Sequence, residues 1–314
     1  MKIVFLDADT VGEVPNINLL NRLGDEFITY EATSPSNLLE RMQGADIVIT
    51  NKVKIGREAI LKNPTLKLIC IAATGMDHID LKTAKENEIQ VKNVVGYSTS
   101  SVVQLTVALL LSLINQIGYY DSYVKSGQYS KGNSFTHLGK PFWEIKGKVV
   151  GIIGLGQIGN EAAKILATFG AKIIYFSTSG LNNSQSYEQV TLDELMRKSD
   201  IICVHAPLNE RTKNLIAYRE LSLLKPTSLI VNVGRGGIIN EADLAKAIDA
   251  NLLAGAAVDV FTTEPLLKDN PLMQVKNTEK LLMTPHIAWS SIEARTTMVA
   301  EVAKNIQEFL NRSK

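Results

Sequence analysis

The chain has 314 residues, of which 45% are hydrophobic and 21% are charged, which is typical of a globular protein with about two domains. The formal net charge is +1 without a block of like charges, so we expect neither nucleic acid nor a membrane surface as a partner. The longest apolar segment, residues 102–113, is too short and too interrupted for a membrane span, and residues 1–7 do not resemble a signal peptide. Cys70 and Cys203 lie in apolar runs, which predicts buried reduced thiols and no metal site. We therefore expect a cytoplasmic protein.

The first hundred residues alternate short apolar runs with helical patterns. The apolar runs predict strands at residues 3–6, 47–49, 66–71 and 89–94, with residues 27–30 as a weaker candidate. The helical patterns cover residues 17–23, 36–42, 57–61 and 81–88. Ser36 and Asp80 are the predicted N-caps of the second and fourth of these helices. This alternation is typical of a parallel α/β layer.

A long helix is predicted over residues 98–126. Its apolar residues cover more than one face, so we expect it to be buried between domains or against another subunit. Residues 127–146 contain Gly, Ser, Asn and Pro, which predicts an irregular loop.

Residues 148–170 combine a strand, a glycine turn and a helix. The apolar run 149–153 predicts a buried strand, and Gly154, Gly156 and Gly159 follow with the spacing G-x-G-x-x-G. Apolar residues then recur at helical spacing up to Gly170, which occupies the position of a helix C-cap. The first glycine permits a tight turn, the second lets the backbone approach a pyrophosphate, and the third lets the helix pack against the strand. This order indicates a dinucleotide-binding site, with a purely structural turn as the weaker alternative.

The α/β alternation continues to the end of the chain. The predicted strands are residues 149–153, 173–176, 201–204, 229–233, 256–260 and 281–283. Helices are predicted at residues 192–198, 241–250 and 292–310. Six parallel strands match the count of a complete doubly wound nucleotide-binding sheet.

Five motifs in this order resemble the D-isomer-specific 2-hydroxy acid dehydrogenase family over the whole chain. They are Gly154-Leu-Gly-Gln-Ile-Gly159, Val204-His-Ala-Pro-Leu208, Asn232-Val-Gly-Arg-Gly-Gly237, Asp259-Val-Phe-Thr-Thr-Glu-Pro265 and Thr284-Pro-His-Ile-Ala-Trp289. The resemblance implies an α/β fold of two doubly wound parallel-sheet domains. Residues 1–97 and 286–314 would form a flavodoxin-like substrate domain, into which a Rossmann dinucleotide-binding domain, residues 98–285, is inserted. It also implies a homodimer formed through the cofactor domains.

The resemblance further implies an oxidoreductase acting on CH–OH donors. Such an enzyme transfers a hydride between a nicotinamide cofactor and a small D-2-hydroxy acid or 2-keto acid. Trp289 resembles the glycerate dehydrogenase (hydroxypyruvate reductase) branch, and beyond Arg235 and Lys52 we find no basic cluster for a phosphorylated substrate. We therefore expect glycerate with hydroxypyruvate, or glyoxylate. A D-lactate dehydrogenase-type pyruvate reductase and an NAD(H)-sensing, corepressor-like binding protein are the alternatives.

Three residues carry the predicted chemistry. His286 follows the end of a strand, where open α/β sheets place their ligands, and imidazole exchanges protons near neutral pH. Glu264 would favour the charged imidazole and hold its tautomer. Arg235 lies between glycines, and its guanidinium can grip the carboxylate and polarise the carbonyl of a keto acid. Each residue alone has a structural reading, and the family motifs favour catalysis.

The resemblance also implies the binding residues. Substrate-binding residues would be Asn51, Lys52, Thr74, Gly75, Arg235 and His286. Cofactor-binding residues would be Gly154, Gly156, Gln157, Ile158, Gly159, Ser177, His205, Pro207, Thr212, Val233 and Asp259. Among these, Gln157 and Ile158 would contact the pyrophosphate, His205 and Pro207 would border the adenosine, and Asp259 would meet the nicotinamide carboxamide.

Ser177 stands where a carboxylate often binds the ribose hydroxyls, about 20 residues after the glycine motif. No carboxylate there repels a 2′-phosphate, and we find no arginine nearby to attract one. We therefore expect NAD as the cofactor, with NADP left open.

Overall fold

The computed structural model describes residues 1–181, 184 and 186–312, which form two compact units. Unit 1 consists of Met1–Ser98 and the C-terminal segment that begins at Trp289, and unit 2 consists of Thr99–Ala288. Each unit is built around one parallel sheet with helices between the strands. The predicted fold class, two doubly wound parallel α/β domains, is confirmed.

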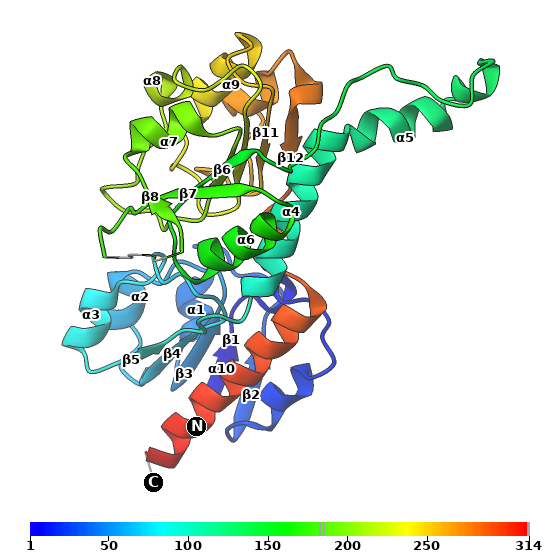
Figure 1. The fold of residues 1–314 in the computed structure, drawn as a ribbon. Coiled ribbons are helices and arrows are strands. Elements are labelled where there is room, and N and C mark those ends of the chain that lie inside the picture. Colours follow the sequence, from blue (N-terminus) through cyan, green and yellow to red (C-terminus); the bar gives the residue numbers. More distant parts are fainter. Residues whose placement is uncertain (182–183, 185, 313–314) are drawn as a thin grey trace. The chain divides into compact units, whose positions relative to one another are not determined.

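Unit 1 contains a five-stranded sheet in the order β2-β1-β3-β4-β5 (Figure 1). Its strands are β1 (Lys2–Phe5), β2 (Glu26–Thr29), β3 (Ile47–Thr50), β4 (Leu68–Ile71) and β5 (Gln90–Lys92). Its helices are α1 (Leu38–Met42), α2 (Arg57–Leu61), α3 (Leu81–Glu86) and α10 (Ile292–Arg312), with short 3-10 helices η1 (Ala8–Thr10) and η2 (Ile17–Arg22). The strand order is that of flavodoxin-like sheets.

Both faces of the unit 1 sheet are buried. Side chains alternate along the strands, so Ile3 and Phe5 enter one core whereas Val4 and Leu6 enter the other. The first core is completed by η2 and by α10, which lies along the sheet in Figure 1. The second is completed by α1, α2 and α3. Burial on both faces explains why these strands are continuous apolar runs, and it shows why the last helix belongs with the first hundred residues.

Unit 2 contains a seven-stranded parallel sheet in the order β12-β11-β10-β9-β6-β7-β8. Its strands are β6 (Val149–Ile153), β7 (Lys172–Phe176), β8 (Glu188–Gln189), β9 (Ile201–Val204), β10 (Leu229–Asn232), β11 (Gly255–Val258) and β12 (Leu281–Met283). The helices between them are α6 (Gln157–Thr168), α7 (Leu192–Lys198), α8 (Tyr218–Leu221) and α9 (Glu241–Asp249), with 3-10 helices η4 (Pro271–Gln274) and η5 (Thr278–Lys280). The prediction of six strands missed β8, because two exposed polar residues at a sheet edge leave no apolar run.

The predicted single helix over residues 98–126 was wrong. Helix α4 (Thr99–Asn115) ends before Gln116, which adopts a left-handed conformation with φ of 52°, and α5 (Ile117–Lys125) then leaves at 61° to α4. Helix α4 packs against α6 and against strands β10 and β11. Helix α5 and the segment after it, which includes η3 (Tyr129–Lys131), extend away from the unit 2 sheet (Figure 1).

The α4–α5 pair also bears on the question of a membrane span. Within the described ranges, no single helix is long and apolar enough to cross a membrane. The bent pair of α4 and α5 would be long and apolar enough only if both helices are counted together. Most of the apolar side chains of α4 are buried inside unit 2.

The two predicted N-caps had different outcomes. Asp80 caps α3, since its carboxylate accepts a hydrogen bond from the Thr83 N–H at 2.9 Å. Ser36 was wrong as a cap, because α1 begins only at Leu38 and Asn37 occupies its N-cap position. The Ser36 hydroxyl instead pairs with the hydroxyl of Ser34 at 2.8 Å.

Both cysteines are buried and unpaired with each other, as predicted. Burial raises the pKa of the Cys70 thiol and of the Cys203 thiol to about 12, so both are protonated near neutral pH. No group of three metal-binding side chains occurs among the residues that the structure describes.

Candidate active site and dinucleotide pocket

His286 and Glu264 form a close pair in unit 2. They lie in the loops that follow the neighbouring strands β12 and β11, and His286 Nδ1 is 2.7 Å from Glu264 Oε2. The other carboxylate oxygen of Glu264 accepts the N–H of Phe261 at 2.9 Å, which ties the carboxylate to its own loop. Because Nδ1 of His286 is engaged, Nε2 is the ring nitrogen left for a substrate.

Asp259 holds the turn that carries His286. Its carboxylate is fully buried and accepts hydrogen bonds from the Thr284 hydroxyl at 2.6 Å and from the N–H groups of Ile287 and Ala288, both at 2.9 Å. Burial raises the pKa of Asp259, and these hydrogen bonds oppose that rise. His286 itself has φ of 53°, a left-handed conformation that is uncommon for residues other than glycine. The predicted contact of Asp259 with the nicotinamide carboxamide stays a prediction.

Arg235 lies in the loop after β10, next to the loop that carries Glu264. A Cβ atom at Gly236 would lie 2.0 Å from the backbone of Phe261, so the two loops touch at a point that accommodates only glycine. The Arg235 side chain is partly buried, and its Nη1 donates to the Gly234 carbonyl at 2.9 Å. Strands β10, β11 and β12 thus place the predicted catalytic residues in the loops at one edge of the unit 2 sheet.

Two of the three motif glycines, Gly154 and Gly159, are required by their surroundings, and Gly156 lies beside open space. Gly154 has φ of 89°, and a Cβ atom there would lie 2.9 Å from Ala206. A Cβ atom at Gly159 would lie 2.1 Å from the Gly154 carbonyl oxygen, so helix α6 packs directly against the turn. Gly156 precedes the first residue of α6 and has nothing within 4 Å of its Cβ position. The turn therefore leaves open space beside the amino end of a helix, which suits the diphosphate of a dinucleotide.

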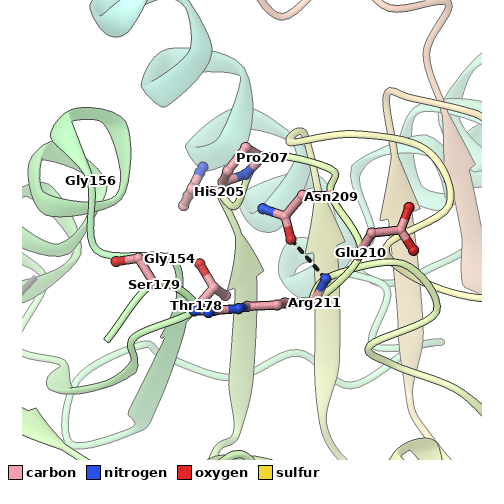
Figure 2. A pocket seen from close by; sticks show the side chains of 9 residues that line it. All are labelled: Gly154, Gly156, Thr178, Ser179, His205, Pro207, Asn209, Glu210 and Arg211. Atoms are coloured by element: carbon pink, nitrogen blue, oxygen red, sulfur yellow. Dashed lines mark hydrogen bonds between the residues drawn. The ribbon is translucent and has the colours of Figure 1, made fainter. Parts of the chain in front are cut away.

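A pocket of about 470 Å³ opens beside this turn (Figure 2). It is lined by Gly154, Gly156, Thr178, Ser179, His205, Pro207, Asn209, Glu210 and Arg211. Four of the predicted cofactor residues are in this set. Strand β6 lies between β7 and β9, so the loops that follow those two strands form opposite walls beside the glycine turn.

His205 lines the pocket and carries polar atoms without a partner in the described part of the chain. The residue as a whole is half-buried, and both of its ring nitrogens are buried and have no hydrogen-bond partner among the described residues. Buried polar atoms without partners are uncommon, so this residue fits the predicted border of an adenosine. Burial lowers the pKa of His205 from 6.5 to about 4, which excludes it as a proton donor near neutral pH.

The pKa of His205 gives a prediction for the effect of pH. Because its folded-state pKa lies below the unfolded value, protonation favours the unfolded chain, and stability is lost as pH falls from about 6.5 toward about 4. An NMR titration of the His205 imidazole is expected to show no protonation above about pH 5. A midpoint near 6.5 would contradict the buried, unpartnered environment.

One sequence interpretation needs correction. No arginine was expected near the Ser177 position, yet Arg211 lines the same pocket as Thr178 and Ser179, the two residues after Ser177. The residues are 34 positions apart in sequence, and only the placement of β6 between β7 and β9 brings their loops together. Thr178, Ser179, Asn209, Glu210 and Arg211 are the lining residues that were not predicted, and no motif marks them.

The other predicted cofactor residues do not line this pocket. Thr212 is fully buried, and its hydroxyl donates to the Pro207 carbonyl at 2.6 Å, which shapes the loop. Val233 and Ser177 are also buried, with 6% and 8% of their surface exposed. Gln157 and Ile158 begin α6, where their N–H groups belong to the open first turn of the helix.

The predicted substrate residues of unit 1 lie at the carboxyl ends of β3 and β4, two adjacent strands. Asn51 is buried, and its side-chain amide donates to the Thr10 hydroxyl at 3.0 Å, whereas Lys52 is exposed. The Thr74 hydroxyl donates to the Val94 carbonyl at 2.9 Å, and Gly75 follows in the same loop. This is the sheet edge where doubly wound folds bind ligands.

Asp7 supports this edge and was not singled out from the sequence. It follows β1, is only 3% exposed, and accepts the N–H groups of Asn51 and Lys52 at 2.9 Å and 2.6 Å. Burial raises the pKa of Asp7, while the backbone hydrogen bonds act in the opposite direction. The sequence feature that could have indicated this role is an acidic residue directly after the carboxyl end of an apolar strand.

Comparisons with known proteins identify the family. The family model for the D-isomer specific 2-hydroxyacid dehydrogenase, NAD binding domain, matches residues 107–288. The hydroxypyruvate reductase of Blautia hydrogenotrophica is 36% identical over 321 residues, which cover 100% of this chain and 98% of the relative. The glycerate dehydrogenase of Methylorubrum extorquens is 33% identical over 98% of this chain and 96% of its own. An acyclic imino acid reductase solved in complex with NADPH and D-Arg is 33% identical, with a TM-score of 0.87 over 99% of this chain and 98% of its own. The chain therefore belongs to the D-isomer specific 2-hydroxyacid dehydrogenase family, and unit 2 contains its NAD-binding domain.

Proposed function

We propose that this enzyme interconverts a small 2-keto acid and its D-2-hydroxy acid, with hydroxypyruvate and glycerate, or glyoxylate, as the substrates. The observation that carries the proposal is the His286–Glu264 pair at 2.7 Å, a proton-exchanging group with an oriented carboxylate. The pair lies in the same unit as the glycine turn and its pocket. The hydroxypyruvate reductase and glycerate dehydrogenase among the relatives support this choice of substrate.

The mechanism assigns a role to each of three side chains. A nicotinamide, when bound, supplies the hydride or takes it up. Nε2 of His286 gives a proton to the carbonyl oxygen during reduction and takes it back during oxidation. Glu264 stabilises the imidazolium and holds the ring with Nδ1 toward the carboxylate. Arg235 binds the substrate carboxylate and polarises the carbonyl group.

The remaining assignments belong to the same proposal. Unit 2 is the dinucleotide-binding domain, and its glycine turn with Gln157 and Ile158 holds the pyrophosphate. Unit 1 is the substrate domain, and Asn51, Lys52, Thr74 and Gly75 are its proposed substrate-binding residues.

We also propose a cytoplasmic homodimer. The segment from α5 onward exposes large apolar side chains that a monomer would leave in water. Phe135 is 92% exposed and Leu138 is 82% exposed, and Ile117 and Val124 are more than half exposed. A second copy of the chain covering this segment would remove that surface from water.

The proposal is tested by steady-state kinetics with hydroxypyruvate, glyoxylate and pyruvate, each with NADH and with NADPH. We expect turnover with hydroxypyruvate or glyoxylate and a lower kcat/KM with pyruvate. Preference for pyruvate would indicate the lactate dehydrogenase-type alternative. Tight cofactor binding without turnover of any keto acid would instead indicate an NAD(H)-sensing binding protein.

A further inference from the structure

The wall of the dinucleotide pocket that follows β7 carries hydroxyl groups, and none of its described lining residues has a carboxylate. Ser177, Thr178 and Ser179 follow the strand, and the last two line the pocket. The Ser177 hydroxyl oxygen accepts the Gly180 N–H at 3.1 Å, and that of Ser179 accepts the Leu181 N–H at 3.1 Å. These bonds use the oxygens as acceptors, so the hydroxyl protons stay available to donate to an anion.

The opposite wall supplies a cation. Arg211 is the only cationic residue among the described residues that line the pocket. Figure 2 shows its side chain reaching from the loop after β9 toward Thr178. Within the described part of the chain, its guanidinium forms no hydrogen bond or ion pair, and only its backbone N–H donates, to Asn209 Oδ1 at 2.9 Å.

The loop that carries Arg211 is held in shape by its own hydrogen bonds. Besides its bond to Pro207, the buried Thr212 hydroxyl accepts the Asn209 N–H at 2.8 Å. The neighbouring acid does not neutralise the cation, because the Glu210 carboxylate points away from Arg211 in Figure 2. A positive charge thus faces donor hydroxyls across an open pocket, an arrangement that attracts a phosphate rather than the bare ribose hydroxyls of NAD.

We infer that this pocket binds the 2′-phosphate of NADP(H), with Arg211 as its cation and Thr178 and Ser179 as hydroxyl donors. The inference rests on the proposed dinucleotide-dependent function and adds which dinucleotide the site prefers. It takes up the NADP alternative that the sequence left open, and it corrects only the premise that no arginine lies near this wall.

Calorimetric binding of adenosine 2′,5′-bisphosphate and of 5′-AMP tests the inference without turnover, since only the first carries the 2′-phosphate. Arg211→Gln should weaken binding of the bisphosphate by about tenfold to a hundredfold, the range for hydrogen bonds to charged groups, and change 5′-AMP by less than about twofold. Lys213→Gln is the matched control, because Lys213 is exposed in the same loop and does not line the pocket. The preference of the native enzyme for the bisphosphate should also fall as salt rises.

Ser179→Asp provides a second variant on the wall opposite Arg211, because Ser179 is exposed and lines the pocket. The new carboxylate should repel a 2′-phosphate and shift the ratio of kcat/KM values, NADPH over NADH, toward NADH by about tenfold or more. An unchanged ratio would count against this wall of the site.

The outcomes separate the inference from the proposed function. If Arg211→Gln leaves the bisphosphate unaffected, or weakens both nucleotides equally, the 2′-phosphate assignment is overturned while the dehydrogenase function stands. If neither nucleotide binds the native protein and no dinucleotide supports turnover, the proposed function itself fails.

Discussion

Replacing His286 with Asn is expected to lower kcat for keto acid reduction by about 10²- to 10⁴-fold, the usual contribution of a positioned general acid. Asn is the preferred replacement because it tolerates the left-handed backbone of position 286, where φ is 53°, better than most residues do. It keeps a polar side chain but cannot transfer the proton. His286→Ala should have the same effect on kcat, with an additional loss of stability from backbone strain.

The His286 prediction is measured by steady-state kinetics together with direct cofactor binding. Cofactor affinity should change little, because His286 does not line the dinucleotide pocket. Glu264→Gln serves as a graded comparison, since the amide can still meet Nδ1 but carries no charge, and we expect a loss of about tenfold. Activity of His286→Asn within about twofold of the native enzyme would show that another group supplies the proton.

Arg235→Lys should lower kcat/KM by about 10²- to 10³-fold although the positive charge is kept. A lysine ammonium cannot reproduce the planar fork that binds a carboxylate and points at a carbonyl oxygen in the same geometry. Gly236 packs this loop against the Glu264 loop, so a shift of the backbone cannot restore the lost geometry. The loss should appear in both KM and kcat, because Arg235 would act on the bound acid and on the developing charge.

Arg219→Lys is the matched control for Arg235→Lys. Arg219 is an exposed arginine of the same unit that pairs with Asp193 at 2.6 Å on the surface, and its replacement should leave kinetics unchanged. If Arg235→Lys retained kcat/KM within about threefold, the guanidinium would be acting only as a distant charge or as a structural partner.

Several features of this chain could be predicted from short stretches of sequence, because interactions between residues close together in the chain determine them. The glycine turn was predicted correctly, since Gly154 has a positive φ and Gly159 admits the Gly154 carbonyl, and no other residue type satisfies both demands. The buried strands were visible as apolar runs because both faces of each sheet are covered. Asp80 was identified as an N-cap because its carboxylate acts on a backbone group only three residues away.

The errors have equally specific causes. The break between α4 and α5 occurs at one residue, Gln116, which adopts a left-handed conformation. Glutamine has no particular preference for that conformation, so the sequence does not predict the break. Strand β8 consists of two polar residues, which form a strand only because they pair with β7. Asp7 contacts the backbone of residues 51 and 52 because β1 and β3 are neighbours in the sheet, and the sequence does not give that strand order.

By itself, the sequence determined the fold class, the position of the glycine turn and the identity of three residues with suitable chemistry. Each of these follows from the spacing of residues along the chain or from the chemistry of a single side chain. The tertiary structure alone decided which distant residues meet. It gave the expected contact of His286 with Glu264 its geometry, placed the Asp259 carboxylate against the turn that carries His286, and brought Arg211 into the same pocket as the hydroxyl groups after β7. The physical reason is that all strands of a parallel sheet have their carboxyl ends at the same edge. Which loops are neighbours at that edge therefore depends on the order of the strands in the sheet and not on distance along the chain.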